Sequence, residues 1–214
     1  FILERAKKHG ISAMFVDYKK FPDKQGAEKA FVQEFRKRKV DLVLLIGFMK
    51  ILSIDPGFER MGVAIIEQAK NNGKPLVVYS ACIKTSPKDP FSTRLKEIGG
   101  AIEEIIKKYK PGACAIEKLF FSANRRTALS VAEARGVSVY EAARHDLPLF
   151  EYSPMEIKVA VAGYGHATKN QIISMVKALV DFKDKEKELA TKKMSDDEFD
   201  AIAIGLTHFA IHKA

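Results

Sequence analysis

The stretch GFMKILSIDPGFERMGVAII, Gly47–Ile66, decides where this chain divides and which fold its larger part adopts. Met49 precedes a run of strand-forming residues that ends at Asp55, where a Pro-Gly turn follows. The pattern predicts a strand over residues 49–55 that opens a new domain. Asp-Pro-Gly supplies turn geometry whatever the function, so a simple turn remains an open explanation. A carboxylate at the end of such a strand also projects toward the edge of the sheet where α/β proteins place ligands.

Further strands and a long helix follow. Residues 62–68 and 75–83 predict two strands joined as a hairpin, and Phe91–Tyr109 has the apolar spacing of an amphipathic helix. A short apolar strand over residues 113–116 ends at Glu117, as the first strand ends at Asp55. We therefore expect two carboxylates at one edge of the sheet, although Glu117 beside a lysine is also typical of an exposed ion pair.

Near the C-terminus, SDDEFDAIAIGLTHFAIH predicts a helix with Asp197 and Asp200 three residues apart at its start. Acidic residues in a first turn are usually explained by the helix dipole, and Ser195 with Glu198 reads as a capping box. That explanation accounts for one acid. Asp200 is different, because it shares a face with the apolar residues that point toward a core.

Four acids on two strand ends and one helix have the composition of a site for a hard cation. Carboxylate oxygens suit Mg²⁺ or Mn²⁺, and two such ions can hold the attacking and leaving oxygens of a phosphodiester. Without cations, like charges packed together would repel each other. The sequence therefore predicts a metal site formed by Asp55, Glu117, Asp197 and Asp200.

Residues 49–214 resemble the RuvC-type Holliday junction resolvases of the RNase H-like superfamily. The matching motifs are SIDPG, AIEKLFFSANRRTALSVAEARG, YSPMEIKVAVAGYGHATKNQI and DDEFDAIAIGLTH, which occur in the order of the family and at similar spacing. The resemblance implies an α/β fold with an RNase H-like mixed five-stranded sheet flanked by helices. It also implies that the four acids bind two Mg²⁺ ions per site, with Mn²⁺ as a substitute, and carry out catalysis.

The same resemblance implies roles in DNA binding for residues outside the acidic set. Phe120 would wedge against bases at the crossover, while Lys158 and Lys169 would hold phosphates near the cut. Arg125 and Arg126 precede a helix and would add backbone attraction. From the residues alone, an aromatic at Phe120 is more often part of a core, and the two lysines are typical of ordinary solvated surface residues.

Residues 1–48 read differently from the rest of the chain. Their pattern predicts helix, strand, helix and strand, an αβαβ order that suits a partial Rossmann-like parallel sheet. Through VDLVLLIGFMKILS, the stretch up to about Ser53 resembles the folate-dependent glycinamide ribonucleotide transformylases. The Asn-x-His motif of formyl transfer does not follow it, and the Gly-rich phosphate loop would precede Phe1. We therefore expect a truncated, non-functional segment before a nuclease domain at residues 49–214.

The composition agrees with a partner of negative charge. The formal net charge is +9, the pI is near 9.4, and the basic excess is spread over both parts of the chain. Cys82 and Cys114 each lie in an apolar strand-like run, which predicts buried thiols rather than a disulfide or metal site. No apolar run approaches 18 residues and no leader pattern is present, so we expect a cytoplasmic protein.

We interpret the chain as a metal-dependent endonuclease that resolves four-way DNA junctions by hydrolysis and leaves 5′-phosphate ends. By resemblance, it acts as a homodimer together with a junction-migrating helicase. A non-catalytic junction-binding protein is the main alternative, with the nuclease impaired by the N-terminal segment. An actin-like nucleotide-binding enzyme fits less well, because the later phosphate-binding glycine loop is missing from the sequence.

Overall fold

The computed structural model describes residue 10 and residues 24–38, 50–68, 73–119, 125–182 and 194–212. The contacts divide the chain into two units, Phe1–Ile46 and Gly47–Ala214. Helix α2 (Lys24–Lys37) belongs to the first unit and matches the second helix predicted there. The strands predicted at residues 11–16 and 42–46, and therefore the αβαβ segment as a whole, lie outside the described residues.

The second unit contains a mixed five-stranded sheet with the order β3-β2-β1-β4-β5. The first three strands pair antiparallel, whereas β4 pairs parallel with both β1 and β5. This confirms the predicted mixed sheet and the predicted hairpin pairing. The strands are β1 (Lys50–Asp55), β2 (Arg60–Glu67), β3 (Leu76–Lys84), β4 (Ala113–Glu117) and β5 (Leu149–Tyr152).

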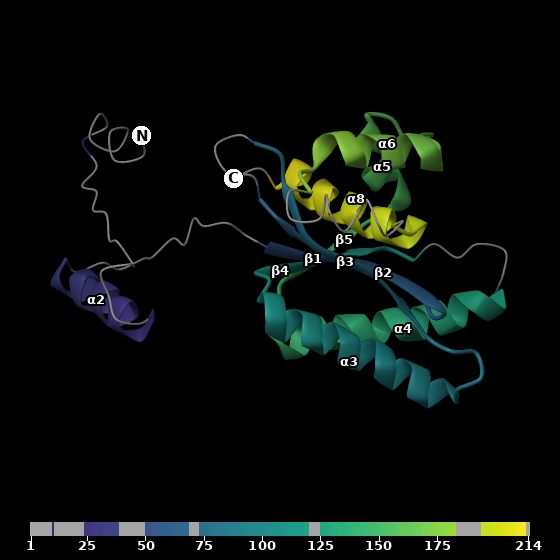
Figure 1. Ribbon diagram of the computed structural model, residues 1–214, viewed down its shortest axis with the longest axis horizontal. Helices are drawn as coiled ribbons and strands as arrows, with labels where there is room; N and C mark the ends of the chain where they lie inside the picture. The colour runs from purple at the N-terminus through teal and green to yellow at the C-terminus, as the bar shows by residue number, and fades with distance from the viewer. Residues whose placement is uncertain are drawn as a thin grey trace. The chain divides into compact units, whose positions relative to one another are not determined.

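Helices cover both faces of this sheet (Figure 1). Helices α3 (Phe91–Tyr109) and α4 (Arg125–Arg144) pack on one face. The other face carries α5 (Pro154–Ala162), α6 (Lys169–Leu179) and α8 (Asp196–Ile211). None of the described helices combines the length and apolar character needed to cross a membrane.

The central strand β1 is buried on both faces, which explains its continuous apolar pattern. Ile51 packs with the core under α8, while Leu52 and Ile54 pack with the core under α3 and α4. Because successive side chains of a strand point to opposite faces, β1 joins the two cores. Its last residue, Asp55, is held at the edge of the sheet by this packing.

Helix α8 approaches the sheet closely at two glycines. A Cβ atom added to Gly62 of β2 would collide with the backbone carbonyl oxygen of Asp197. A Cβ atom on Gly205 would lie 2.5 Å from the Ile66 side chain. The capping box between Ser195 and Glu198, predicted from the sequence, begins the helix at this point. The start of α8 is thereby fixed against the strand beside β1.

Candidate active site

The four predicted acids come from three elements that meet at one edge of the sheet. Asp55 ends β1 and Glu117 ends β4, and these strands are parallel neighbours with Ile54 opposite Ile116. Asp197 and Asp200 lie in the first turns of α8, which packs over β1 and β2. The negative charges of Glu117, Asp200 and Asp197 all act on Asp55. The fold therefore gathers the acids that the sequence singled out.

The two strand acids carry raised pKa values. Burial raises the pKa of Asp55 to about 8, and the charges of the other three acids add to this effect. Burial likewise raises the pKa of Glu117 to about 7, with the charge of Asp200 adding to it and Lys158 opposing it. At neutral pH the Asp55 carboxyl group therefore favours its protonated form, whereas Glu117 lies near the midpoint of its titration.

The two helix acids are instead held by basic side chains. Arg60 donates to Asp197 Oδ2 from Nε at 3.0 Å and also from Nη2, and the Cys82 thiol lies 3.4 Å from the same oxygen. Burial would raise the pKa of Asp197, but these hydrogen bonds outweigh it and hold the pKa below its ordinary value. Lys169 Nζ lies 3.0 Å from Asp200 Oδ2. Even so, burial keeps the pKa of Asp200 above its ordinary value.

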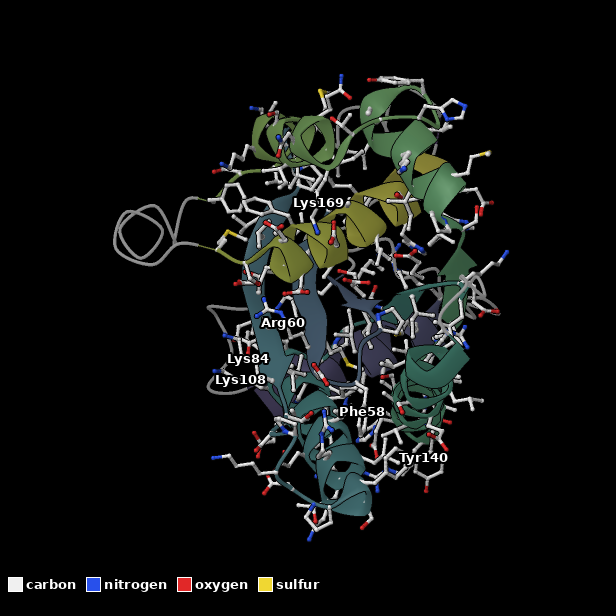
Figure 2. The ribbon with its side chains drawn as sticks, turned by 90° about the vertical axis from the view of Figure 1, so that its right-hand side faces the viewer. Phe58, Arg60, Lys84, Lys108, Tyr140 and Lys169 are labelled. Carbon is white, nitrogen blue, oxygen red and sulfur yellow. The ribbon has the colours of Figure 1, made fainter. Side chains whose placement is uncertain are left out.

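Figure 2 shows the basic side chains of Arg60 and Lys169 on two sides of α8. A cavity of about 250 Å³ opens beside the helix and is lined by Glu117, Lys158, Lys169 and Asp200, with apolar side chains beneath them. Negative and positive groups thus share one opening. This combination suits a polyanion that must be bound beside a cation.

The donor set fits a hard divalent cation in its chemistry, because all four predicted ligands are carboxylates. As placed, however, no group of three or more His, Cys, Asp or Glu side chains within the described ranges could hold a metal ion. Asp197 and Asp200 turn toward Arg60 and Lys169 instead. A cation bound by both helix acids would compete with Arg60 and Lys169 for their side-chain oxygens.

Side chains outside the predicted set fix the two strand ends. Arg135 of α4 donates from Nε to the backbone oxygen of Glu117 at 3.2 Å and also binds Glu151 of β5. At the turn after Asp55, the Thr85 hydroxyl donates to the backbone oxygen of Phe58 at 2.6 Å. Buried Arg94 donates from Nε to that hydroxyl at 2.9 Å, and its guanidinium lies 3.8 Å above the labelled Phe58 ring in Figure 2.

A second contact ties β5 to α8. Tyr152, which pairs with Glu117 in the sheet register, shares a hydrogen bond of 2.9 Å with Nδ1 of buried His208. Burial lowers the pKa of His208 to about 4, so the ring is neutral at physiological pH. Burial and the contact with Tyr152 give His208 a structural role.

The predicted DNA-binding residues are described only in part. Phe120 lies outside the described residues, and so do the side chains of Arg125 and Arg126, whose backbone begins α4. Lys158 lies on α5 and Lys169 begins α6, and both line the cavity beside Glu117. Their roles in DNA binding, like the catalytic roles of the acids, remain predictions.

Sequence reasoning missed Arg60 and gave Cys82 the wrong surroundings. Cys114 is buried as predicted, but Cys82 is only half-buried and contacts Asp197. The cause is the hairpin: β2 starts at Arg60 and β3 passes Cys82 opposite Gly62, directly beneath the start of α8. Neither residue lies in a motif, so only the pairing of β2 with β3 and the contact with α8 bring them to the site.

Comparison with known proteins identifies the family. The family described as "Crossover junction endodeoxyribonuclease RuvC" matches residues 51–208. The RuvC protein of Pelotomaculum thermopropionicum is 41% identical over 160 residues, covering 75% of this chain and 92% of the relative. The RuvC protein of Thermotoga maritima is 38% identical over 163 residues, covering 76% of this chain and 92% of the relative.

Solved structures agree with these relatives. The structure of Thermus thermophilus RuvC superimposes with a TM-score of 0.67 at 30% identity and covers 77% of this chain and 96% of its own. A second structure shows T. thermophilus RuvC in complex with a Holliday junction substrate, with the same TM-score and identity, covering 76% of this chain and 94% of its own. This chain belongs to the RuvC family of crossover junction endodeoxyribonucleases.

Proposed function

We propose that residues 49–214 form a metal-dependent endonuclease that resolves four-way DNA junctions by paired phosphodiester hydrolysis and leaves 5′-phosphate ends. One observation carries the proposal beyond family membership. Half-buried Asp55 and Glu117 end neighbouring strands and have raised pKa values, and Glu117 meets Asp200 of α8 at a cavity that also holds Lys158 and Lys169. Carboxylates that repel one another at one sheet edge are suited to a shared cation.

Asp55, Glu117, Asp197 and Asp200 would hold the metal, which we propose to be two Mg²⁺ ions, with Mn²⁺ as a substitute. When bound, such ions lower the pKa of water and neutralise charge on the phosphate in the transition state. The protein contributes the fixed positions: Asp55 and Glu117 are held by the paired strands β1 and β4, and Arg135 anchors the backbone of Glu117. Their raised pKa values mean that both must release a proton before they coordinate.

The lysines would hold the DNA backbone. Lys169 is half-exposed and contacts both Asp200 and Asp196, so it lies between the acids and solvent. Once Asp200 turns to a cation, the Lys169 ammonium is left to bind a phosphate oxygen. Lys158 lines the same cavity, and its charge already acts on Glu117. The two lysines thus bracket the space next to the predicted cutting site.

The contacts with the rest of the junction are proposals of the same kind. We propose that Phe120 stacks on unpaired bases and that Arg125 and Arg126 attract the backbone. A homodimer would provide two sites for paired cuts, and exposed Leu129 and Tyr140 on α4 offer apolar surface that a second copy can cover. A junction-migrating helicase is the proposed cytoplasmic partner.

The N-terminal part supplies no group to this chemistry in our proposal. We infer that residues 1–48 are a truncated transformylase-like segment and that the nuclease begins at Met49. A chain of residues 49–214 should then fold and cut junctions at least as well as the full chain. Melting curves and cleavage rates of the two chains test this, and an unfolded or inactive shorter chain would refute the division.

A labelled synthetic four-way junction tests the proposed function. Incubation with Mg²⁺ under single-turnover conditions should give paired nicks with ligatable 5′-phosphates, and linear duplex of the same sequence should stay uncut. Omission of the metal is the control for metal dependence. If the chain binds the junction tightly but never cuts it with Mg²⁺ or Mn²⁺, the non-catalytic alternative is correct.

Phe120→Ala separates base stacking from a role in the core. Stacking contributes about 1–3 kcal/mol per base, so junction affinity should fall while the melting temperature changes little. Truncating a core phenylalanine would instead remove about 3–5 kcal/mol of folding stability. A large fall in melting temperature would rule out the stacking role.

A further inference from the structure

Arg60 contacts Asp197 and lies outside the family motifs. Its Nε lies 3.0 Å from Asp197 Oδ2, and its Nη2 contacts the same oxygen. The side chain is 48% exposed and that of Asp197 is 22% exposed. The pair therefore sits at the mouth of the site, where solvent and ions can reach it.

Arg60 occupies one of the two side-chain oxygens of Asp197, an acid that we propose as a metal ligand. Asp197 Oδ2 already accepts from Arg60 and from Cys82 at 3.4 Å, so this oxygen has little capacity left for a further partner. The backbone of Asp197 packs closely against Gly62, two residues from Arg60 in β2. A divalent ion that binds this carboxylate oxygen therefore competes with the guanidinium.

The pair of Lys169 and Asp200 does not present the same conflict. Lys169 Nζ also lies 3.5 Å from a second acid, Asp196. The flexible side chain of Lys169 lets the ammonium group move when Asp200 turns away. Arg60 makes both of its described hydrogen bonds to one oxygen of Asp197. Displacing Arg60 from Asp197 therefore requires more free energy than displacing Lys169 from Asp200.

We propose that Arg60 serves as an internal cation on Asp197 that a divalent metal must displace, so that Arg60 sets how tightly the site binds metal. The inference rests on the proposed metal-dependent function. It goes beyond that function because it assigns a role to a residue outside the catalytic motifs. Removing the guanidinium should tighten metal binding, although it also removes an ion pair that stabilises the folded protein.

Two effects determine how much the Mn²⁺ affinity should change when Arg60 is removed. Loss of Arg60 frees the carboxylate oxygen, and it also removes a positive charge a few ångströms from the incoming ion. At water-like dielectric, a single charge and a divalent ion about 5 Å apart repel by an amount equivalent to roughly tenfold in affinity. We expect Arg60→Gln to bind Mn²⁺ about tenfold more tightly than the unaltered chain.

Calorimetric titration of the DNA-free chain with MnCl₂ at fixed pH and ionic strength measures this without a cleavage assay. Arg60→Lys keeps the charge and should lie between the unaltered chain and Arg60→Gln. Arg144→Gln is the matched control, because Arg144 is 42% exposed and also pairs with acids, Glu103 and Glu141, on α3 and α4. It should leave Mn²⁺ affinity unchanged.

A double substitution shows whether the effect passes through Asp197. In an Asp197→Asn background the carboxylate contact is absent and only the charge repulsion remains, so Arg60→Gln should tighten Mn²⁺ binding less than it does in the unaltered chain. Unchanged or weaker binding by Arg60→Gln would overturn the proposal while leaving metal dependence intact. Absence of Mn²⁺ binding by every variant would overturn both this proposal and the proposed function.

Discussion

Negative charge is offset in different ways on the two acids of the strands and on the two acids of α8. Asp55 and Glu117 are held by the sheet and have pKa values raised by burial, so that they take up protons more readily than ordinary carboxyl groups. Asp197 and Asp200 lie on the helix and are compensated by Arg60 and Lys169. The metal-free site therefore avoids four adjacent negative charges by two separate means. If the four acids bind cations as proposed, protons would leave the strand pair and basic side chains would leave the helix pair.

Substituting a strand acid should have the largest effect. Even the outer partners of metal ligands contribute about 10–100-fold, so Asp55→Asn or Glu117→Gln should reduce single-turnover junction cleavage by at least about 100-fold. Junction binding should persist, because the basic residues are unchanged. Glu103→Gln on α3 is a control, since Glu103 pairs with Lys107 away from the four acids. Cleavage at the normal rate by either variant would disprove the four-acid site.

The dependence of stability on pH should separate the strand acids from other groups. The folded pKa of Asp55, about 8, exceeds its ordinary value of 3.8, so the folded state binds more protons between these values. This contribution to stability is present below pH 4 and is lost as the pH rises toward 8. Because each pKa unit corresponds to about 1.4 kcal/mol, the effect amounts to a few kcal/mol.

Asp55→Asn provides the comparison, because the amide mimics the protonated acid. Without metal, the variant and the unaltered chain should melt together near pH 4, and the variant should become more stable as the pH rises to 8. The lowered pKa of His208 acts in the opposite direction below pH 6.5 but is common to both chains. A constant difference across this range would show that the pKa of Asp55 is not raised.

A shift of α8 should move Asp197 and Asp200 out of position and lower both stability and cleavage. Gly62→Ala places a methyl group where the Asp197 carbonyl oxygen lies, so α8 must shift at a cost of about 1–3 kcal/mol, with cleavage reduced as well. Gly100→Ala in α3 is the matched control, because its added Cβ meets nothing within 4 Å. That control should be neutral or stabilising by about 0.5–1 kcal/mol. Equal melting temperatures for the two variants would contradict the close approach of α8.

The smallest effect should come from the pair of Lys169 and Asp200. A double-mutant cycle with Lys169→Met and Asp200→Asn should give a coupling energy below about 1 kcal/mol in thermal unfolding, because Lys169 is half-exposed. The coupling should shrink further at high salt. A salt-independent coupling of several kcal/mol would place this pair among the buried interactions instead.

The positions of the four acids in the fold could be predicted because each lies at the boundary of a regular pattern. Asp55 and Glu117 are the last residues of apolar strands, Asp197 lies within the capping box, and Asp200 follows it. The mixed five-stranded sheet was expected from the family resemblance, whereas its strand order is known only from the structure. Arg60 has no local signal, because its partner is 137 positions away and is brought close by packing. Partners of this kind follow from the fold and not from any spacing in the chain.

The thiol of Cys82 offers a chemical reporter of the charge on Asp197. Burial and the contact with Asp197 both raise the thiol pKa, which slows alkylation, while Cys114 is fully buried with a pKa of about 12. Neutralising Asp197, by a cation or by substitution, removes one of these two effects and should speed the reaction at Cys82. The rate of modification at a single cysteine therefore follows the ionic state of the site in a protein that carries no added label.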